Sequence, residues 1–169
     1  MTREDLAQLA PYFDATETYV NGHPVDWSVV NALTMVNMKL LRVALGAPIL
    51  LIRGPHPNRS EAVDACCPSV PLRRVVMELC RLPQCSWGVY SGNSFHLDTR
   101  PYETVPARWM AVHEAERPVL VAHGLQRCIT SERDGWLYLP WSHASAWELL
   151  EIVVALADAK KSSTKSLST

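Results

Sequence analysis

The sequence predicts an α+β fold in which a small, mainly antiparallel sheet is packed with helices. Two segments, 26–45 and 71–81, carry apolar residues at helical spacing, and short β-type runs bounded by turn residues lie beside them. A further amphipathic segment near the C-terminus predicts a helix that closes the fold. Because 169 residues suit one core, we expect a single domain over residues 1–159 and a flexible polar tail over 160–169.

Charge and composition disfavour several classes of protein. The chain has 16 basic and 17 acidic residues, a formal charge of −1, so we expect no nucleic-acid partner. No apolar run approaches the roughly 20 residues that span a bilayer, so no membrane span is expected. Glu4 and Asp5 stand where a secretory signal would be basic. We therefore expect a cytoplasmic protein, for which delivery to the cell envelope would need another route.

The elements of the first half follow from caps and turns. A β-compatible stretch over 15–20 ends in the turn-forming residues 21–24, which predicts a chain reversal. The main core helix, 26–45, is closed by Gly46, and a buried strand follows over 48–52. Residues 53–64 are mostly polar and predict a surface loop. The expected apolar residues of the helix are Val29, Val30, Leu33, Val36, Leu40, Leu41 and Ala44.

The second half begins with the helix over 71–81, whose apolar stripe is Leu72, Val75, Val76, Leu79 and Cys80. Residues 87–90 and 95–98 then predict a hairpin around the turn 91–94. Later β-type runs are expected at 119–122, 126–130 and 135–139, with a turn at 131–134. Ser145 and Glu148 form a capping-box pattern before the apolar residues of the last helix, Leu149, Ile152, Val153 and Leu156.

Motifs between residues 60 and 109 resemble those of the zinc D-Ala-D-Ala carboxypeptidase and endolysin family, which shares its fold with the hedgehog signalling domain. The matching motifs are Ala62 and Asp64 at the end of the loop, Gly88-Val89-Tyr90, Asn93, Phe95-His96-Leu97-Asp98-Thr99 and Arg108-Trp109. The resemblance extends over 26–109, about half of the chain. It implies a carboxypeptidase-like fold and a zinc-dependent carboxypeptidase or endopeptidase acting on peptidoglycan stem peptides.

The resemblance also implies a set of zinc ligands. His56, Asp64 and His96 supply the three ligands that a catalytic zinc takes while it keeps one position for water. His56 stands eight residues before Asp64, where the family places its histidine seven residues before. The acid that family members often place three residues before the last histidine is Asn93 here, which leaves Asp98 as the candidate catalytic base. On a strand, His96 and Asp98 would share one face.

A second hypothesis comes from these departures. The fold can persist while the metal is lost, and the chain would then be a catalytically inactive relative that serves as a binding or assembly module, for example in a phage or virus particle. In that case His96 is a hydrogen-bonded structural histidine and Asp98 bonds a loop. His96→Ala would distinguish the two hypotheses, because only a metal site would lose zinc.

Cysteines and tryptophans leave two further alternatives open. The five cysteines form no C-x-x-C pair, which favours reduced, packed thiols, although the pair Cys66 and Cys67 follows Asp64 and offers a soft ligand. Trp136, Trp141 and Trp147 gather in the C-terminal part. They predict either a small core, which we favour, or the lining of a binding groove.

Overall fold

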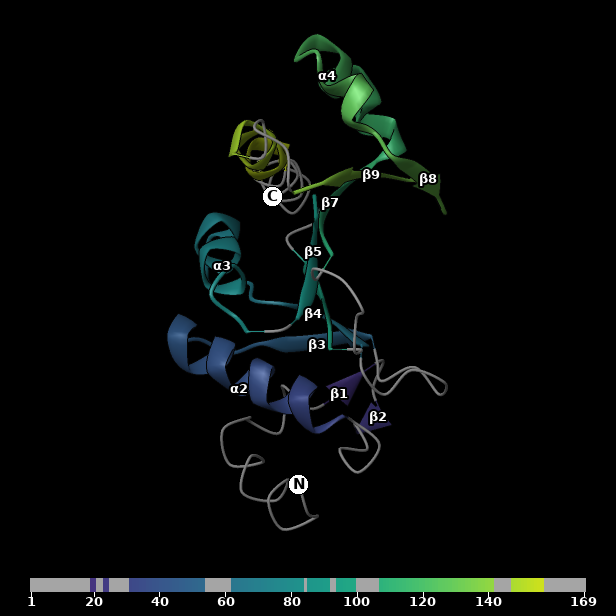
Figure 1. The fold of residues 1–169 in the computed structure, drawn as a ribbon. Helices are drawn as coiled ribbons and strands as arrows, with labels where there is room; N and C mark the ends of the chain where they lie inside the picture. The colour runs from purple at the N-terminus through teal and green to yellow at the C-terminus, as the bar shows by residue number, and fades with distance from the viewer. Residues whose placement is uncertain are drawn as a thin grey trace, which may run out of the picture. The chain divides into compact units, whose positions relative to one another are not determined.

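The structure is a computed structural model that describes residues 19–20, 23–24, 31–53, 62–83, 85–91, 94–99, 107–141 and 147–156. It confirms the α+β class. Seven strands are hydrogen-bonded in the order β3-β4-β6-β5-β7-β9-β8, and the sheet is mostly antiparallel (Figure 1). These strands are β3 Leu50–Arg53, β4 Ala62–Cys66, β5 Ser86–Tyr90, β6 Ser94–Asp98, β7 Arg108–His113, β8 Ser131–Arg133 and β9 Trp136–Pro140.

The chain forms two compact units. Unit 1 consists of Met1–Trp87 and Ser94–Pro106, and unit 2 of Gly88–Asn93 and Ala107–Thr169. A single domain over 1–159 stays a prediction, and the predicted tail, 160–169, lies outside the described residues. Among the helices that the structure describes, none has both the length and the apolar composition that crossing a membrane requires.

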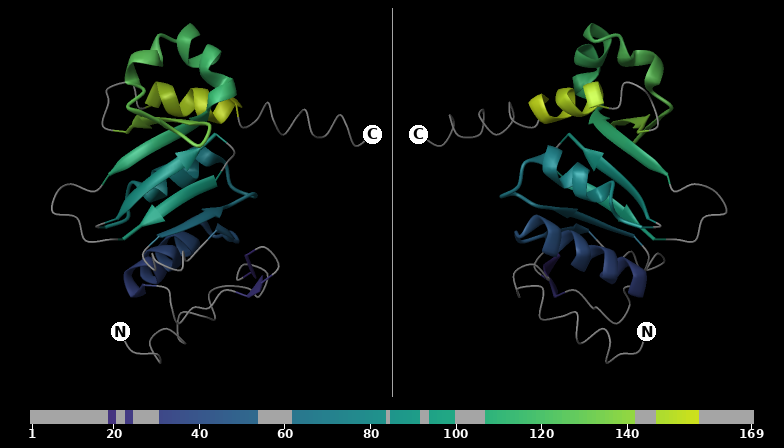
Figure 2. Two further views of the ribbon diagram at one scale, coloured as in Figure 1. Left: turned by 90° about the vertical axis from the view of Figure 1, so that its right-hand side faces the viewer. Right: turned by 60° about the vertical axis from the view of Figure 1, so that its left-hand side comes forward.

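In unit 1, the short pair β1 Tyr19–Val20 and β2 His23–Pro24 confirms the predicted chain reversal. β1 contacts β3. Figure 2 shows β1 and β2, in purple, in two further views. Helix α2, Ala32–Leu45, begins where the Asn31 side chain accepts a hydrogen bond of 2.8 Å from the Leu33 amide. It ends at Gly46, whose φ of 63° is the left-handed conformation that glycine adopts without strain. Residues 26–30 of the predicted helix lie outside the described residues.

The predicted buried face of α2 is wrong in part. Leu40 is 46% exposed and Ala44 is also exposed, whereas the helix buries Met35, Met38, Leu41 and Leu45, together with the polar Thr34 and Asn37. Apolar residues occur on two faces of this helix, so periodicity alone does not decide which face packs. The Thr34 and Thr99 hydroxyls, 2.6 Å apart, join α2 to the end of β6 inside unit 1.

The predicted loop over 53–64 is also wrong at its end, because Ala62–Asp64 belong to strand β4. β4 pairs with β3 on one side and with β6 on the other, so its backbone groups are satisfied within the sheet. β3 is an edge strand rather than a fully buried one, and its Ile52 is 44% exposed. Helix α3, Leu72–Leu79, confirms its predicted stripe: Leu72, Val75, Val76 and Leu79 are buried, and the helix packs against α2.

In unit 2, strands β7 and β9 pair antiparallel and bury Met110, Val112, Leu137 and Leu139 completely. β8 and β9 form a hairpin whose turn is Asp134-Gly135 rather than 131–134. Both turn residues have positive φ, 54° and 77°, which suits the tight turn of a two-residue hairpin. The structure places Ser131–Arg133 in β8, so the predicted turn there is wrong.

Two other β-type runs of the C-terminal part are helical. Residues 119–122 belong to helix α4, Arg117–Ala122, and most of 126–130 lies in the 3-10 turn η5, Leu125–Cys128. A capping box precedes α4, in the turn η4 Glu114–Glu116, where Glu116 accepts a hydrogen bond from the His113 amide and the His113 ring accepts one from Ala115. Ser91 also donates to Glu116, at 2.7 Å. This local capping overrides the β propensity of the valines that follow.

The last helix spans residues 147–156 and buries Leu149, Leu150, Ile152 and Val153. Its predicted cap at Ser145 lies outside the described residues. The three C-terminal tryptophans do not form one buried core, because Trp147 is 52% exposed and Trp136 is only half-buried. Trp141 and Trp147 contact each other edge to face, whereas Trp136 contacts other rings.

Candidate functional site

The candidate site lies on the middle strands of unit 1. In the antiparallel pair β4 and β6, Asp64 stands directly opposite His96. Successive side chains of a strand point to opposite faces, so these two residues share the face opposite to the buried Val63 and Leu97. Each of the two side chains is 23% exposed. The sheet register therefore brings together a carboxylate and an imidazole that are 32 residues apart in the chain.

A second carboxylate completes the cluster on the same strand as His96. Asp64 Oδ1 lies 2.7 Å from His96 Nδ1, a hydrogen bond, and Asp98 Oδ2 lies 3.9 Å from His96 Nε2. The side chain of Asp98 is only 2% exposed. The predicted shared face of His96 and Asp98 is thus present, and the imidazole lies between two carboxylates, one at each ring nitrogen.

This environment keeps His96 protonated at neutral pH. Burial lowers the pKa of His96, but the hydrogen bond to Asp64, the polar contact with Asp98 and the negative charges of both carboxylates outweigh it. Together they raise the pKa from 6.5 to about 9. At pH 7 both ring nitrogens therefore carry protons, and any metal ion that bound a ring nitrogen would have to displace one of them.

We expect the folding stability to depend on pH through this residue. Because the pKa is higher in the folded protein than the ordinary 6.5, the stabilisation is complete below pH 6.5 and is lost as the pH rises through about 9. The effect is on the order of 3 kcal/mol. Urea unfolding at a series of pH values should show this decline in wild type and a flatter profile in His96→Gln. Equal profiles for the two proteins would contradict the assignment.

Of the predicted ligands, the structure brings Asp64 and His96 together, and His56 lies outside the described residues. The role of Asp98 as the catalytic base stays a prediction. In that role, an oxygen of this buried carboxylate would have to reach the water molecule bound to zinc. Burial raises the pKa of the Cys66 thiol, which disfavours the thiolate that a soft metal ligand requires. Cys67 is buried and its thiol lies 3.1 Å from the Pro48 carbonyl, as expected for a packed cysteine.

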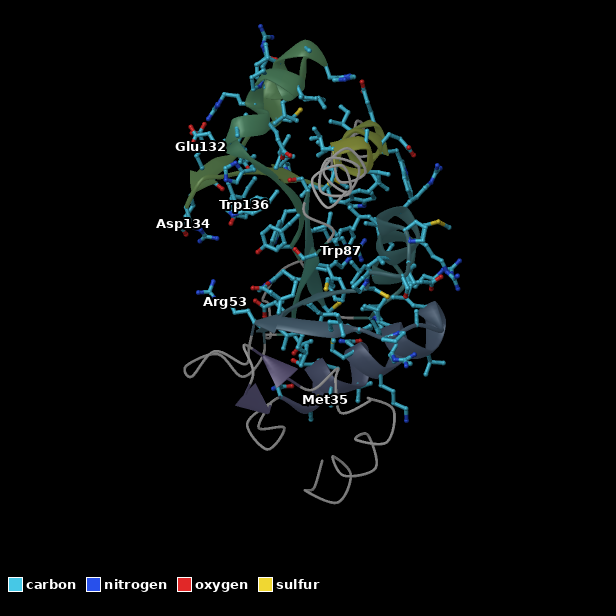
Figure 3. The ribbon with its side chains drawn as sticks, turned by 180° about the vertical axis from the view of Figure 1, so that it is seen from behind. Met35, Arg53, Trp87, Glu132, Asp134 and Trp136 are labelled. Atoms are coloured by element: carbon cyan, nitrogen blue, oxygen red, sulfur yellow. The ribbon has the colours of Figure 1, made fainter. Side chains whose placement is uncertain are left out.

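Sequence reasoning missed Arg53 as a neighbour of this site. Arg53 ends β3, is exposed, and is the register partner of Asp64 on the neighbouring strand. Figure 3 shows its side chain on the side of the strands away from α3. The predicted loop over 53–64 separated Arg53 from the sheet. The short run over 62–66, which is apolar except for Asp64 at its centre, was the signal that could have indicated a strand opposite it.

Within the described ranges, no three His, Cys, Asp or Glu side chains are grouped so that a single metal ion could bind all of them. Comparison of the chain with protein-family models, curated proteins and solved structures yields no match. The site itself consists of a partly exposed carboxylate and imidazole in contact, a buried carboxylate near the second ring nitrogen, and an arginine on the adjoining strand.

Proposed function

We propose that the chain is a zinc-dependent, carboxypeptidase-like hydrolase that cleaves peptide bonds in the stem peptides of peptidoglycan. The observation that supports this function is the contact between Asp64 and His96, the two ligands that the sequence motifs imply on separate segments of the chain. Their side chains meet at 2.7 Å on a partly exposed face of the sheet. His56 is the proposed third ligand.

The donor atoms fit zinc. Carboxylate oxygen and imidazole nitrogen are both ligands that zinc accepts in catalytic sites, and here one of each converges from neighbouring strands. When bound, zinc lowers the pKa of a water molecule enough to supply a hydroxide near neutral pH. The strands contribute rigidity, because both ligands lie inside hydrogen-bonded β structure and not on loops.

The remaining charged residues near the site would orient the His96 ring and bind the substrate. Asp98 lies at the ring nitrogen of His96 that faces away from Asp64, where a buried carboxylate fixes the ring orientation and increases its basicity. We therefore propose Asp98 as a positioning residue for His96 in addition to its predicted role as base. Arg53 offers a guanidinium on the adjoining strand, a group that binds peptide carboxylates well.

Hydrolysis of purified stem peptides by the full chain, supplied with zinc, tests this function. We expect release of a terminal residue or an internal fragment, measured by mass spectrometry, and loss of that activity in His96→Ala. The matched control is His123→Ala, which removes an exposed histidine at the end of α4. Wild-type protein that contains zinc and cleaves no stem peptide would contradict the proposed substrate.

A second candidate function is a binding or assembly module without metal. It is favoured by the same cluster, because an imidazolium held between two carboxylates is complete as a structural ion pair without any ligand. In that case His96→Ala would lower the free energy of unfolding and leave the metal content unchanged at zero.

A further inference from the structure

A histidine caps the helical segment that joins β7 to β8 in unit 2. His113 ends β7, and its ring nitrogen Nδ1 accepts a hydrogen bond of 3.2 Å from the Ala115 amide at the start of the turn η4. A backbone N–H can only donate, so Nδ1 carries no proton in this arrangement. The cap therefore requires the neutral form of the His113 imidazole.

Three polar interactions hold this turn at the start of α4. Besides the His113 ring, the Glu116 carboxylate accepts from the His113 amide at 3.0 Å and from Ser91 at 2.7 Å. Arg117, the first residue of α4, pairs with Glu132 on β8 at 2.8 Å. Of these groups, the imidazole is the one whose ordinary titration falls between pH 5 and pH 8. A change of pH in that range therefore acts on the His113 cap.

Helix α4 packs loosely against the rest of unit 2. Leu120 is the one buried residue among its six. A cavity of about 410 Å³ lies between α4 and helix 147–156, with Val119 and His123 on one side and Ile152 and Leu156 on the other. Because few apolar contacts hold this helix, the hydrogen bonds at its start matter more for its local stability than they would in a buried helix.

Carboxylates surround the His113 ring. The charged and titratable groups of the elements packed around it are Glu114 and Glu116 in η4, Arg117 in α4, Glu132, Arg133 and Asp134 in β8 and its turn, and the phenols of Tyr90 and Tyr138 near Trp136, the ring that His113 contacts at 5.5 Å. A Cβ atom on Gly135 would lie 3.7 Å from His113 Nε2, so this turn adjoins the ring. Figure 3 shows Glu132 and Asp134 at the same hairpin as Trp136. Arg117 pairs with Glu132, and Arg133 with Asp134 at 3.9 Å, so each cation has a carboxylate beside it.

Protonation of His113 reverses the role of its ring nitrogen. With a proton on Nδ1 the ring can no longer accept from Ala115, and it becomes a donor in a turn whose acceptors include the carboxylates of Glu114 and Glu116. The new positive charge also lies at a helix start, where the amide N–H groups already carry partial positive charge. We propose that His113 is a pH-sensitive cap, which holds the segment 114–128 when it is neutral and loosens that segment when it is protonated.

NMR spectroscopy of the full chain between pH 8 and pH 5 tests this switch. We expect the Ala115 amide signal to move with the titration of the His113 ring. The hydrogen-exchange protection factors of the α4 amides, which are corrected for the intrinsic pH dependence of exchange, should fall about fivefold as the ring becomes protonated. His96 does not disturb the measurement, because its pKa of about 9 keeps it protonated throughout. The inference does not rest on the proposed zinc site, since the residues that carry it lie in unit 2.

Two variants assign the response to His113. His113→Asn keeps a side-chain acceptor at the cap but cannot be protonated, so its protection factors should stay constant over the same pH range. His123→Ala removes the histidine at the other end of α4 and should keep the wild-type response. The proposal is overturned if the α4 protection factors of wild type do not change with pH, or if they fall equally in His113→Asn. It is also overturned if the Ala115 signal follows the ring titration while the α4 protection factors stay constant.

Discussion

Asp64→Asn is expected to weaken zinc binding by about a hundredfold or more and to bring the pKa of His96 back toward 6.5. Asp64 lies in direct hydrogen-bond contact with His96, with Oδ1 2.7 Å from Nδ1. The asparagine amide keeps the size of the side chain but loses the charge that zinc and the imidazolium both require. Isothermal titration with zinc, and NMR titration of the His96 ring, measure the two effects.

Asp98→Asn is a control that should weaken zinc binding less than Asp64→Asn does. The Asp98 carboxylate lies 3.9 Å from Nε2, the other ring nitrogen of His96, and would not bind the metal itself. We therefore expect the zinc affinity to fall by about tenfold to a hundredfold. His123→Ala should leave zinc binding unchanged. If Asp64→Asn binds zinc as tightly as wild type does, Asp64 is not a ligand and the proposed metal site is wrong.

Gly88→Ala is expected to destabilise the protein by about 1–3 kcal/mol, the usual range for forcing an extra methyl group into a packed site. The new Cβ would lie 2.2 Å from the Trp109 indole, so the ring has to leave its position over Gly88. It would then lose its edge-to-face contacts with Tyr90 and Tyr138. Urea unfolding of the variant and of wild type gives the difference directly.

A double-mutant cycle identifies the cause of that loss. In a Trp109→Ala background the indole is absent, so adding the Gly88→Ala change should cost little further stability. If Gly88→Ala costs the same free energy of unfolding with and without the indole, the contact between Gly88 and Trp109 does not explain the loss.

The sequence predicted the elements best where pattern and turn chemistry agree. Helix α3 was predicted with its buried stripe because its apolar residues follow a single face, and strands β5 and β6 were predicted because turn residues separate two β-type runs. The face of α2 was predicted wrongly because apolar residues such as Leu40 and Met38 lie on different sides of one helix. Only tertiary packing decides between two such faces.

For the candidate site, the sequence predicted Asp64, His96 and Asp98 as site residues but not how their side chains meet. The contact between Asp64 and His96 depends on the register of β4 against β6, and β4 itself was predicted as loop up to Asp64. A carboxylate directly opposite a histidine is a property of strand pairing, and one residue of slip would place the two side chains on opposite faces. The ring contacts of Trp109 with Tyr90 and Tyr138 depend in the same way on β7, which the sequence did not predict as a strand.

Zinc analysis of the full chain, purified without chelator, tests the central claim most directly. The metal content of wild type should be one zinc per chain, and that of His96→Ala should be zero, with His123→Ala matching wild type. Uptake of zinc by metal-free wild type should release protons near neutral pH, because His96 is protonated there. Wild-type protein that holds no zinc and takes up none when it is supplied would contradict the claim and leave the cluster of Asp64, His96 and Asp98 as a structural ion pair.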